Sequence, residues 1–326
     1  MNAASEAIIF DRTNASLSTP DLRSLIHVRA LQTTHKILRP FGYIGISRLH
    51  NMISKITRPT TMTMVREGRF CFRFPSNDYY WNRLLDPSWS YEPEIDVVLA
   101  HFADVPYVFL DLGANFGYWS ARVASGLYGE HPVVAVEASE FCFQLLKLNV
   151  NKLNAHIHHR AIDSVSDKRI SLFGSRHAGF SIDENWYGAS KNVVNDVVSV
   201  TIDDLLTLEN LDADQQPVIV KLDVEGVELR ALQGASAAIA GKTAFIIEDA
   251  DRSGLSDAVR YAIDELGMTI FSIEDGHFNK LSTLEELTSV NANKSQIQAT
   301  GLNLIATKSP FWIKRLTGSN SERVRP

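Results

Sequence analysis

Between residues 107 and 308, short apolar runs alternate with longer segments in which apolar residues recur at helical spacing. Runs typical of strands occupy residues 107–111, 133–137, 155–162, 218–223, 244–248, 268–273 and 302–306. Segments typical of helices occupy residues 119–127, 141–153, 202–208, 227–240 and 255–266. Continuous apolar strands separated by helices are typical of a parallel sheet covered on both faces. The pattern predicts a doubly wound α/β sheet of seven main strands.

The last two predicted strands, 268–273 and 302–306, have no convincing helical pattern between them. Parallel neighbours need a crossover, usually a helix. We therefore expect these two strands to form an antiparallel pair at the edge of a mostly parallel sheet. Two further strand-like runs, 170–173 and 197–201, flank an insertion at 174–195 that is long enough to shape a substrate pocket.

The N-terminal part has a different pattern. Residues 1–20 are rich in Ser, Thr and Asn, and we expect them to be disordered. Residues 21–56 show helical spacing interrupted at Pro40-Phe41-Gly42, and a strand-like run follows at 69–74. The chain is thus predicted to comprise a partly disordered, basic, helical extension (1–88), an α/β domain (89–308) and a basic tail (309–326).

Composition is that of an ordinary globular protein, with 45% apolar and 21% charged residues. No run of about 18 apolar residues occurs, so we expect no transmembrane helix. The first thirty residues lack the apolar core of a secretory signal. Two cysteines, Cys71 and Cys142, are too few for a disulfide framework or a zinc site. These features favour a cytoplasmic location.

The net charge of −6 is unevenly distributed. Residues 1–60 carry eight basic and three acidic side chains, and the last eighteen residues carry four and one, so the middle of the chain is strongly acidic. An acidic body argues against a broad nucleic-acid surface. The basic ends are either solvated faces or contacts for a membrane surface or an anionic partner.

The loop after the first predicted strand, Asp111-Leu112-Gly113-Ala114-Asn115-Phe116-Gly117, has the glycines of a ligand-binding turn before a helix. It is not the Gly-x-Gly-x-x-Gly of a dinucleotide site. The carboxylate of Asp111 would repel a pyrophosphate but suits the ammonium group of a methionine moiety. We take Asp111, Gly113, Asn115 and Gly117 as cofactor-binding residues rather than as a bare strand–helix turn.

Two more carboxylates follow the next predicted strands. Glu137 ends the second strand, where an acid accepts hydrogen bonds from ribose hydroxyls in folds of this topology. Asp163 follows the third strand, where it is placed to read an adenine amino group. The alternatives are a carboxylate at a helix start for Glu137 and a simple turn residue for Asp163.

The fourth predicted strand ends in Lys221-Leu222-Asp223-Val224-Glu225-Gly226, and alternation places Lys221 and Asp223 on one face. Ligands bind at the carboxyl ends of such strands. Glu248 ends the fifth strand and is followed by Asp249 and Asp251, which we expect to extend this acidic rim. The predicted catalytic residues are Lys221, Asp223, Glu225 and Glu248. Glu228 is left out, because a glutamate there suits a helix start.

Histidines and aromatic residues are less informative. His156, His158 and His159 lie in one strand, whose alternation divides them between two faces, so no metal cluster is predicted. In the insertion, His177 is a possible proton acceptor, and Trp186 and Tyr187 are placed to stack on a sugar ring.

With these motifs, the chain resembles the FkbM family of methyltransferases, which belong to the Rossmann-like class I group. The resemblance covers about residues 89–308. Its motifs are Tyr91-Glu92-Pro93-Glu94, Asp111–Tyr118, Val136-Glu137-Ala138, Leu146–Asn149, Val200–Leu205, Lys221–Glu228 and Glu248. The usual Glu-Pro after the second strand is Glu137-Ala138 here, which keeps the carboxylate.

The resemblance implies S-adenosylmethionine as cofactor, with Glu92 among the residues that bind it. It also implies methyl transfer to an oxygen, often a hydroxyl of a sugar, a glycan or a secondary metabolite. We expect this transfer to need no metal ion. The alternatives are a non-catalytic cofactor-binding or scaffolding protein and, less well supported, a nicotinamide-dependent oxidoreductase, for which the glycine pattern is missing.

Overall fold

The computed structural model describes residues 8–38, 60–175, 177–186, 191–249, 255–274, 276–282, 286–287 and 302–318. The chain divides into two compact units, Met1–Tyr91 and Glu92–Pro326. The larger unit contains the motifs from Glu92 onward, and the smaller one contains the whole of the predicted N-terminal extension (1–88).

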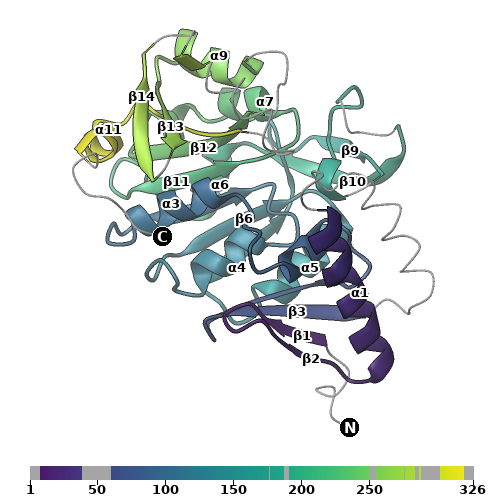
Figure 1. Ribbon diagram of the computed structural model, residues 1–326. Helices are drawn as coiled ribbons and strands as arrows, with labels where there is room; N and C mark the ends of the chain where they lie inside the picture. The colour runs from purple at the N-terminus through teal and green to yellow at the C-terminus, as the bar shows by residue number, and fades with distance from the viewer. Residues whose placement is uncertain are drawn as a thin grey trace. The chain divides into compact units, whose positions relative to one another are not determined.

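The larger unit is built on a sheet with the strand order β14-β13-β15-β12-β11-β5-β6-β7 (Figure 1). Its strands are β5 (Val108–Leu112), β6 (Val133–Glu137), β7 (Ala155–His159), β11 (Val218–Leu222), β12 (Thr243–Asp249), β13 (Thr269–Glu274), β14 (His277–Leu281) and β15 (Leu302–Thr307). The five strands from β7 to β12 are parallel. Strand β15 runs antiparallel to both β12 and β13, and β14 runs antiparallel to β13. The carboxyl ends of β5, β6, β11 and β12 therefore lie along one edge of the sheet.

The mixed α/β fold and the mostly parallel sheet confirm the prediction, but the count of seven strands was one too low. The predicted antiparallel pair is β13 with β15, whereas the edge strand is β14. Strand β14 escaped prediction because it has no apolar run. Of its five residues only Phe278 is deeply buried, and Asn279 and Lys280 are exposed.

Helices flank this sheet: α3 (Pro93–His101), α4 (Tyr118–Ala124), α5 (Glu140–Asn149), α6 (Ile202–Leu208), α7 (Glu228–Gln233), α8 (Ser236–Ala240), α9 (Asp257–Asp264) and α11 (Pro310–Gly318). Three of them begin at a hydroxyl N-cap, since Ser139, Thr201 and Ser256 each accept a backbone N–H three residues on. The helix predicted at 227–240 is divided into α7 and α8 around Gly234.

The core follows from the strand sequences. Every residue of β5, β6 and β11 is buried, as expected for central parallel strands that are covered on both faces. Because an apolar residue is the default at such positions, the buried charges Asp111, Glu137 and Lys221 stand out.

A second, smaller sheet flanks the insertion. Its order is β8-β10-β9, formed by β8 (Ala161–Ile162), β9 (Arg169–Phe173) and β10 (Val193–Val200). The two extra strands predicted around the insertion are thus confirmed, and they pair antiparallel. Between them lies the short helix η4 (His177–Gly179). The insertion is therefore held at its base by a hairpin.

The smaller unit corrects the prediction of a helical, partly disordered extension. It contains a four-stranded sheet of order β2-β1-β3-β4, made of β1 (Ile8–Asp11), β2 (Ser16–Ser18), β3 (Thr61–Arg66) and β4 (Phe70–Pro75). It also contains α1 (Leu22–Leu38) and η3 (Trp81–Leu85). The polar composition of residues 1–20 hides Ile8 and Phe10, which are fully buried. The predicted interruption at Pro40 lies outside the described residues.

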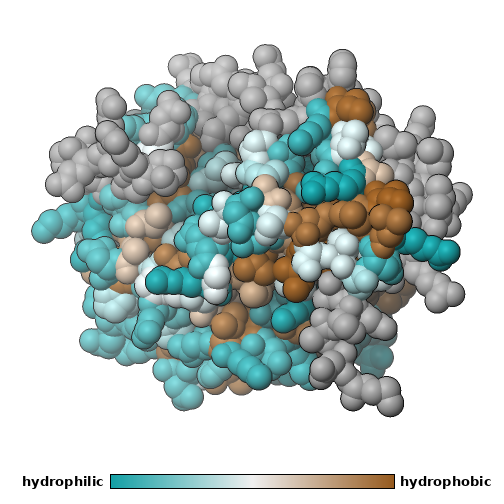
Figure 2. Space-filling model, turned by 60° about the horizontal axis from the view of Figure 1, so that its bottom comes forward, coloured by the Kyte–Doolittle hydropathy of each residue, from teal (hydrophilic) through white to brown (hydrophobic). Residues whose placement is uncertain are grey.

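Most of the surface in Figure 2 is hydrophilic, with apolar residues gathered in a band on one side of that face. Among the described residues, large exposed apolar side chains include Leu22, Ile26 and Ile37 on α1 and Phe141 and Leu148 on α5. None of the helices in the described parts of the chain has the length and apolar character needed to cross a membrane.

Candidate active site

The loop that follows β5 uses left-handed backbone at Gly113, Asn115 and Gly117, whose φ angles are 82°, 53° and 81°. A Cβ atom on Gly113 would lie 1.8 Å from the carbonyl oxygen of Asp223. One on Gly117 would lie 2.5 Å from Leu146 Cδ1. Both the backbone conformation and these close approaches favour glycine. The two glycines thus let the loop pack against the end of β11 and against α5.

Asp111 lies in β5 just before this loop and is 1% exposed. Its Oδ2 accepts hydrogen bonds from the backbone N–H (3.0 Å) and the hydroxyl (2.5 Å) of Ser120. Within the described part of the chain, Oδ1 is buried and has no hydrogen-bond partner. Burial raises the pKa of Asp111, and the ammonium of Lys221 opposes that rise. Oδ1 of this buried carboxyl group is therefore available to a ligand at the predicted cofactor loop.

Glu137, at the end of β6, shapes the same loop. Its Oε2 accepts the backbone N–H of Asn115 and its Oε1 that of Ser139, both at 2.7 Å. Burial raises the pKa of Glu137 to about 7. The carboxyl group thus joins the ends of β5 and β6, and its protonation changes near neutral pH.

The insertion reaches the loop as well. The side-chain amide of Asn115 donates a hydrogen bond to the carbonyl oxygen of His177 (2.9 Å). The ring of His177 lies 4.5 Å from that of Phe116, measured between centroids. His177 therefore contacts the loop that follows β5, a placement that its sequence position alone did not indicate.

Lys221 and Asp223 form an ion pair at the end of β11. Lys221 Nζ lies 2.6 Å from Asp223 Oδ2, and the lysine side chain is 3% exposed. In the parallel register, Lys221 is the neighbour of Asp111 on β5. Burial disfavours the charged ammonium, but Asp223, Glu92 and Asp111 together raise the pKa of Lys221. Burial would likewise raise the pKa of Asp223, but the charge of Lys221 and the hydrogen bonds from Glu248 and Lys221 together outweigh burial and lower that pKa. Both members of the pair are therefore ionised at neutral pH.

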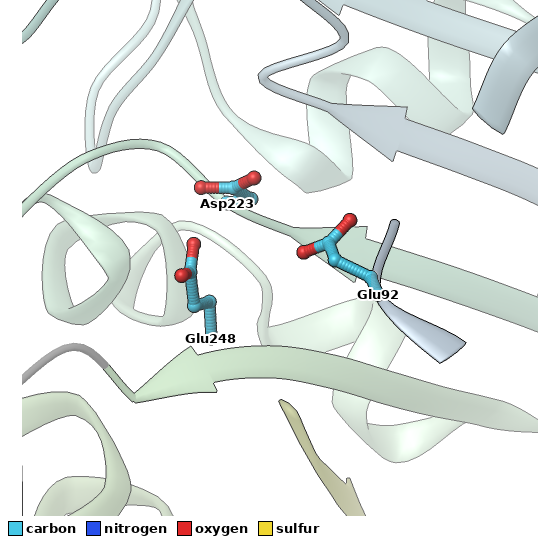
Figure 3. Close-up of side chains that lie close together, drawn as sticks. All are labelled: Glu92, Asp223 and Glu248. Atoms are coloured by element: carbon cyan, nitrogen blue, oxygen red, sulfur yellow. The ribbon is translucent and has the colours of Figure 1, made fainter. Parts of the chain in front are cut away.

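Glu92 and Glu248 complete a cluster with Asp223 (Figure 3), and one carboxylate oxygen of each lies within 4.8 Å of the others. Glu92 directly precedes α3 and is held by Trp119 Nε1, which donates to Oε2 (2.6 Å), and by Asn303 Nδ2, which donates to Oε1 (3.4 Å). Glu248 lies in β12 and is hydrogen-bonded to Asp223. The predicted site residues of three strands and of the segment before α3 thus meet.

Three carboxyl groups at this spacing offer the oxygen ligands that Mg²⁺ or Ca²⁺ prefers. Two features of the cluster itself also reduce its negative charge. Lys221 contributes a positive charge to Asp223. Burial and the charge of Asp223 raise the pKa of Glu248 well above its ordinary value, so that Glu248 holds a proton. Independence from a metal ion stays a prediction, for which an experiment is given below.

The segment after Asp223 brings two more glutamates to the site. Glu225 has a φ angle of 46°, and its Oε2 accepts the indole N–H of Trp186 (3.1 Å). Burial and the charge of Asp223 raise the pKa of Glu225 to about 8. Glu228 accepts the backbone N–H groups of Val224 and Gly226, which agrees with the helix-start role expected for it.

Asp163 and Asp249 are engaged elsewhere. Asp163 is buried and forms a bidentate ion pair with Arg230, with contacts of 2.7 and 2.5 Å. Its adenine-reading role stays a prediction, although both oxygens already have partners. Asp249 is buried and accepts the backbone N–H of Ser256 before α9. The expectation that Asp249 extends the acidic rim is therefore wrong, because alternation along β12 turns it away from Glu248. Asp251 and Tyr187 lie outside the described residues.

The histidines of β7 divide as alternation predicts. His156 and His158 contact the two oxygens of Glu209, at 2.5 and 2.6 Å. His159 lies 3.2 Å from Glu140. His159 also contacts the carbonyl oxygen of Ala138 and the ring of Phe143. None of these described partners belongs to the carboxyl cluster.

Ser120, Trp119 and Asn303 are the residues that sequence reasoning missed. They hold Asp111 and Glu92 through hydrogen bonds. One signal was present, because Asn303 is the single amide within the apolar run Leu302-Asn303-Leu304-Ile305-Ala306. A buried amide in a strand needs a partner, although the sequence does not say which.

A family model described as the methyltransferase FkbM domain matches residues 111–278, which is just over half of the chain. The chain belongs to the FkbM methyltransferase family. The matched segment runs from Asp111 to Phe278 and contains every catalytic residue predicted above. No curated protein matches the chain.

Solved structures give weaker likenesses. Methyltransferase FkbM from Methylobacillus flagellatus KT is 19% identical, over 62% of this chain and 43% of its own, with a TM-score of 0.40. A TehB-like SAM-dependent methyltransferase from Corynebacterium glutamicum is 13% identical, over 71% and 95%, with a TM-score of 0.37. The plantazolicin methyltransferase BpumL, solved with SAH, is 14% identical, over 67% and 86%, with a TM-score of 0.31. The chain thus spans less than half the length of the first of these proteins.

Proposed function

We propose that this FkbM-family chain transfers a methyl group from S-adenosylmethionine to a hydroxyl oxygen of a sugar, a glycan or a secondary metabolite. One observation carries the proposal. The ends of β5, β11 and β12 bring Asp111, the Lys221–Asp223 pair and Glu248 together beside a glycine loop. Ligands of open α/β sheets bind outside the carboxyl ends of the strands.

The residues at the loop fit this cofactor. The buried Oδ1 of Asp111 suits the methionine ammonium, directly or through a water molecule. Glu137, which accepts the backbone N–H of Asn115 in this loop, also accepts hydrogen bonds from ribose hydroxyls in this proposal. Gly113, Asn115 and Gly117 give the loop its shape. A site this rich in carboxyl groups favours a cation and disfavours the pyrophosphate of a nicotinamide dinucleotide.

When bound, the cofactor supplies an electrophilic methyl group on a positively charged sulfur. The protein must then align the acceptor hydroxyl and accept its proton. Asp223, kept ionised by Lys221, accepts a hydrogen bond from that hydroxyl and orients it. Glu225 takes the proton, because its pKa of about 8 is close to the working pH. Glu248 holds Asp223 in place through a hydrogen bond, and Glu92 belongs to the same cluster.

Two substitutions separate binding from chemistry. We expect Asp111→Ala to abolish binding of S-adenosylmethionine in calorimetry while the protein stays folded, because the ammonium loses its carboxylate. Asp223→Asn should keep most of the binding and lower kcat by about 100-fold or more, assayed with labelled cofactor on a panel of hydroxylated acceptors.

The matched controls are Asp167→Ala and Asp196→Asn, both at exposed positions of the same unit. Unchanged affinity in Asp111→Ala would refute the placement of the cofactor. Cofactor binding by the wild type without transfer to any acceptor of the panel would favour the scaffolding alternative.

Cofactor affinity should depend on pH through Glu137. Below pH 7 its carboxyl group holds a proton in the free protein, and binding ribose hydroxyls as a carboxylate requires its release. We therefore expect the Kd to weaken by up to about tenfold from pH 8 to pH 6, as measured by calorimetry. Glu137→Gln should bind more weakly and show a flat profile, and an equally steep profile in that variant would place the titrating group elsewhere.

Methyl transfer should survive removal of divalent cations. Because Lys221 supplies a positive charge within the carboxyl cluster, we expect the rate after EDTA treatment to stay within about twofold of the untreated rate, with or without added Mg²⁺. Loss of activity that Mg²⁺ restores would show that Glu92, Asp223 and Glu248 bind a metal ion instead.

A further inference from the structure

The described part of the insertion touches the site at two points. At one, His177 contacts Asn115 and Phe116 of the cofactor loop. At the other, Ser181 and Trp186 contact the segment that follows Asp223. The β9–β10 hairpin anchors the base of the insertion, so the insertion bridges the two loops that form the site.

Trp186 packs directly on the backbone of Gly226. A Cβ atom at that position would lie between 2.2 and 2.8 Å from three carbon atoms of the indole ring. The φ angle of Gly226 is 88°, a conformation that other residues rarely adopt. Glycine at 226 therefore allows the ring to lie against the loop, and stacking of Trp186 on a sugar ring stays a prediction.

Trp186 holds the side chain of Glu225, and Ser181 holds its backbone. Trp186 Nε1 donates to the carboxylate oxygen Oε2 (3.1 Å), and Ser181 Oγ donates to the backbone carbonyl oxygen (2.6 Å). Ser181 is itself paired with Phe173 of β9 through two backbone hydrogen bonds. Glu225 has a left-handed φ angle of 46°, which costs free energy in a residue other than glycine. These contacts offset that cost.

We propose that Trp186 is a positioning residue, which holds the Glu225 carboxylate beside Asp223 through its indole N–H. The insertion thereby controls Glu225, the group that takes the proton from the hydroxyl of the methyl acceptor. The catalytic meaning rests on the proposed function. The contact itself and its effect on the pKa of Glu225 are independent of the proposed function.

The charges around Glu225 come from three elements. Asp223 and Lys221 lie on the β11 side, Glu228 begins α7, and Glu248 lies on β12. Burial and the two nearest carboxyl groups disfavour the Glu225 carboxylate, whereas the indole N–H and Lys221 favour it. Removing only the indole N–H should therefore raise the pKa of Glu225 further, because a hydrogen bond to the charged form stabilises that form.

The test is an NMR titration of the full chain with S-adenosylhomocysteine added. The carboxyl carbon of Glu225 is assigned by its loss in Glu225→Gln, and the indole N–H of Trp186 by its loss in Trp186→Phe, which keeps an aromatic ring. Trp312→Phe is the matched control, because it also removes an indole hydrogen bond, to the carbonyl oxygen of Lys242, at the distant α11.

We expect Glu225 to titrate near pH 8 in the wild type and in Trp312→Phe, and about one pH unit higher in Trp186→Phe. In the wild type, the Trp186 indole N–H should titrate with the same midpoint and lose this response in Glu225→Gln. Equal midpoints in wild type and Trp186→Phe, or an indole signal unaffected by Glu225→Gln, would overturn the proposal. If the Glu225 midpoint rises in Trp186→Phe but the wild type transfers no methyl group to any acceptor, the contact would be supported and the proposed function refuted.

Discussion

The arrangement of the site depends on one buried ammonium group, that of Lys221. An isolated charge in a protein interior is strongly unfavourable, and so are several carboxylates gathered at one point. Here the ammonium and the carboxylates stabilise each other, because Lys221 contacts Asp223 at 2.6 Å and lies beside Asp111 and Glu92. A buried charge in such a cluster needs hydrogen bonds as well as a charged partner. This explains why Asp111 and Glu92 are each fixed by hydrogen bonds from other side chains.

The sheet brings these groups together through its register. Lys221 and Asp111 are paired positions on adjacent parallel strands, and Glu248 is paired with Asn303 on β15. Asn303 in turn donates to Glu92, so β15 links the segment before α3 to the cluster. Antiparallel β15 thus has a role in the site as well as in the sheet. The insertion contacts the loops after β5 and β11 through His177 and Trp186.

Much of this could be predicted from local sequence. Continuous apolar runs indicated the central strands, and charged residues at their ends indicated the site, because few charges occur in such positions without a partner. The rest depends on contacts between residues far apart in the chain. The pairing of Trp186 with Glu225 leaves no local signal. Asn303 shows only that a buried amide needs a partner, and nothing in its own strand indicates that the partner is Glu92. In the N-terminal sheet only β4 was predicted, from the run at 69–74. Strands β14 and β1 were missed because buried residues such as Phe278, Ile8 and Phe10 are hidden among polar ones.

The most direct test of this account is the free energy of unfolding of Lys221→Met, compared with the wild type by urea titration at pH 5 and pH 8. Without the ammonium, burial should raise the pKa of Asp223, so that the folded state retains a proton that the unfolded state has released. Stability then falls as pH rises through the folded-state pKa. The account predicts that the variant loses at least about 1.4 kcal/mol more at pH 8 than at pH 5, one pKa unit's worth. An equal loss at both pH values would contradict it.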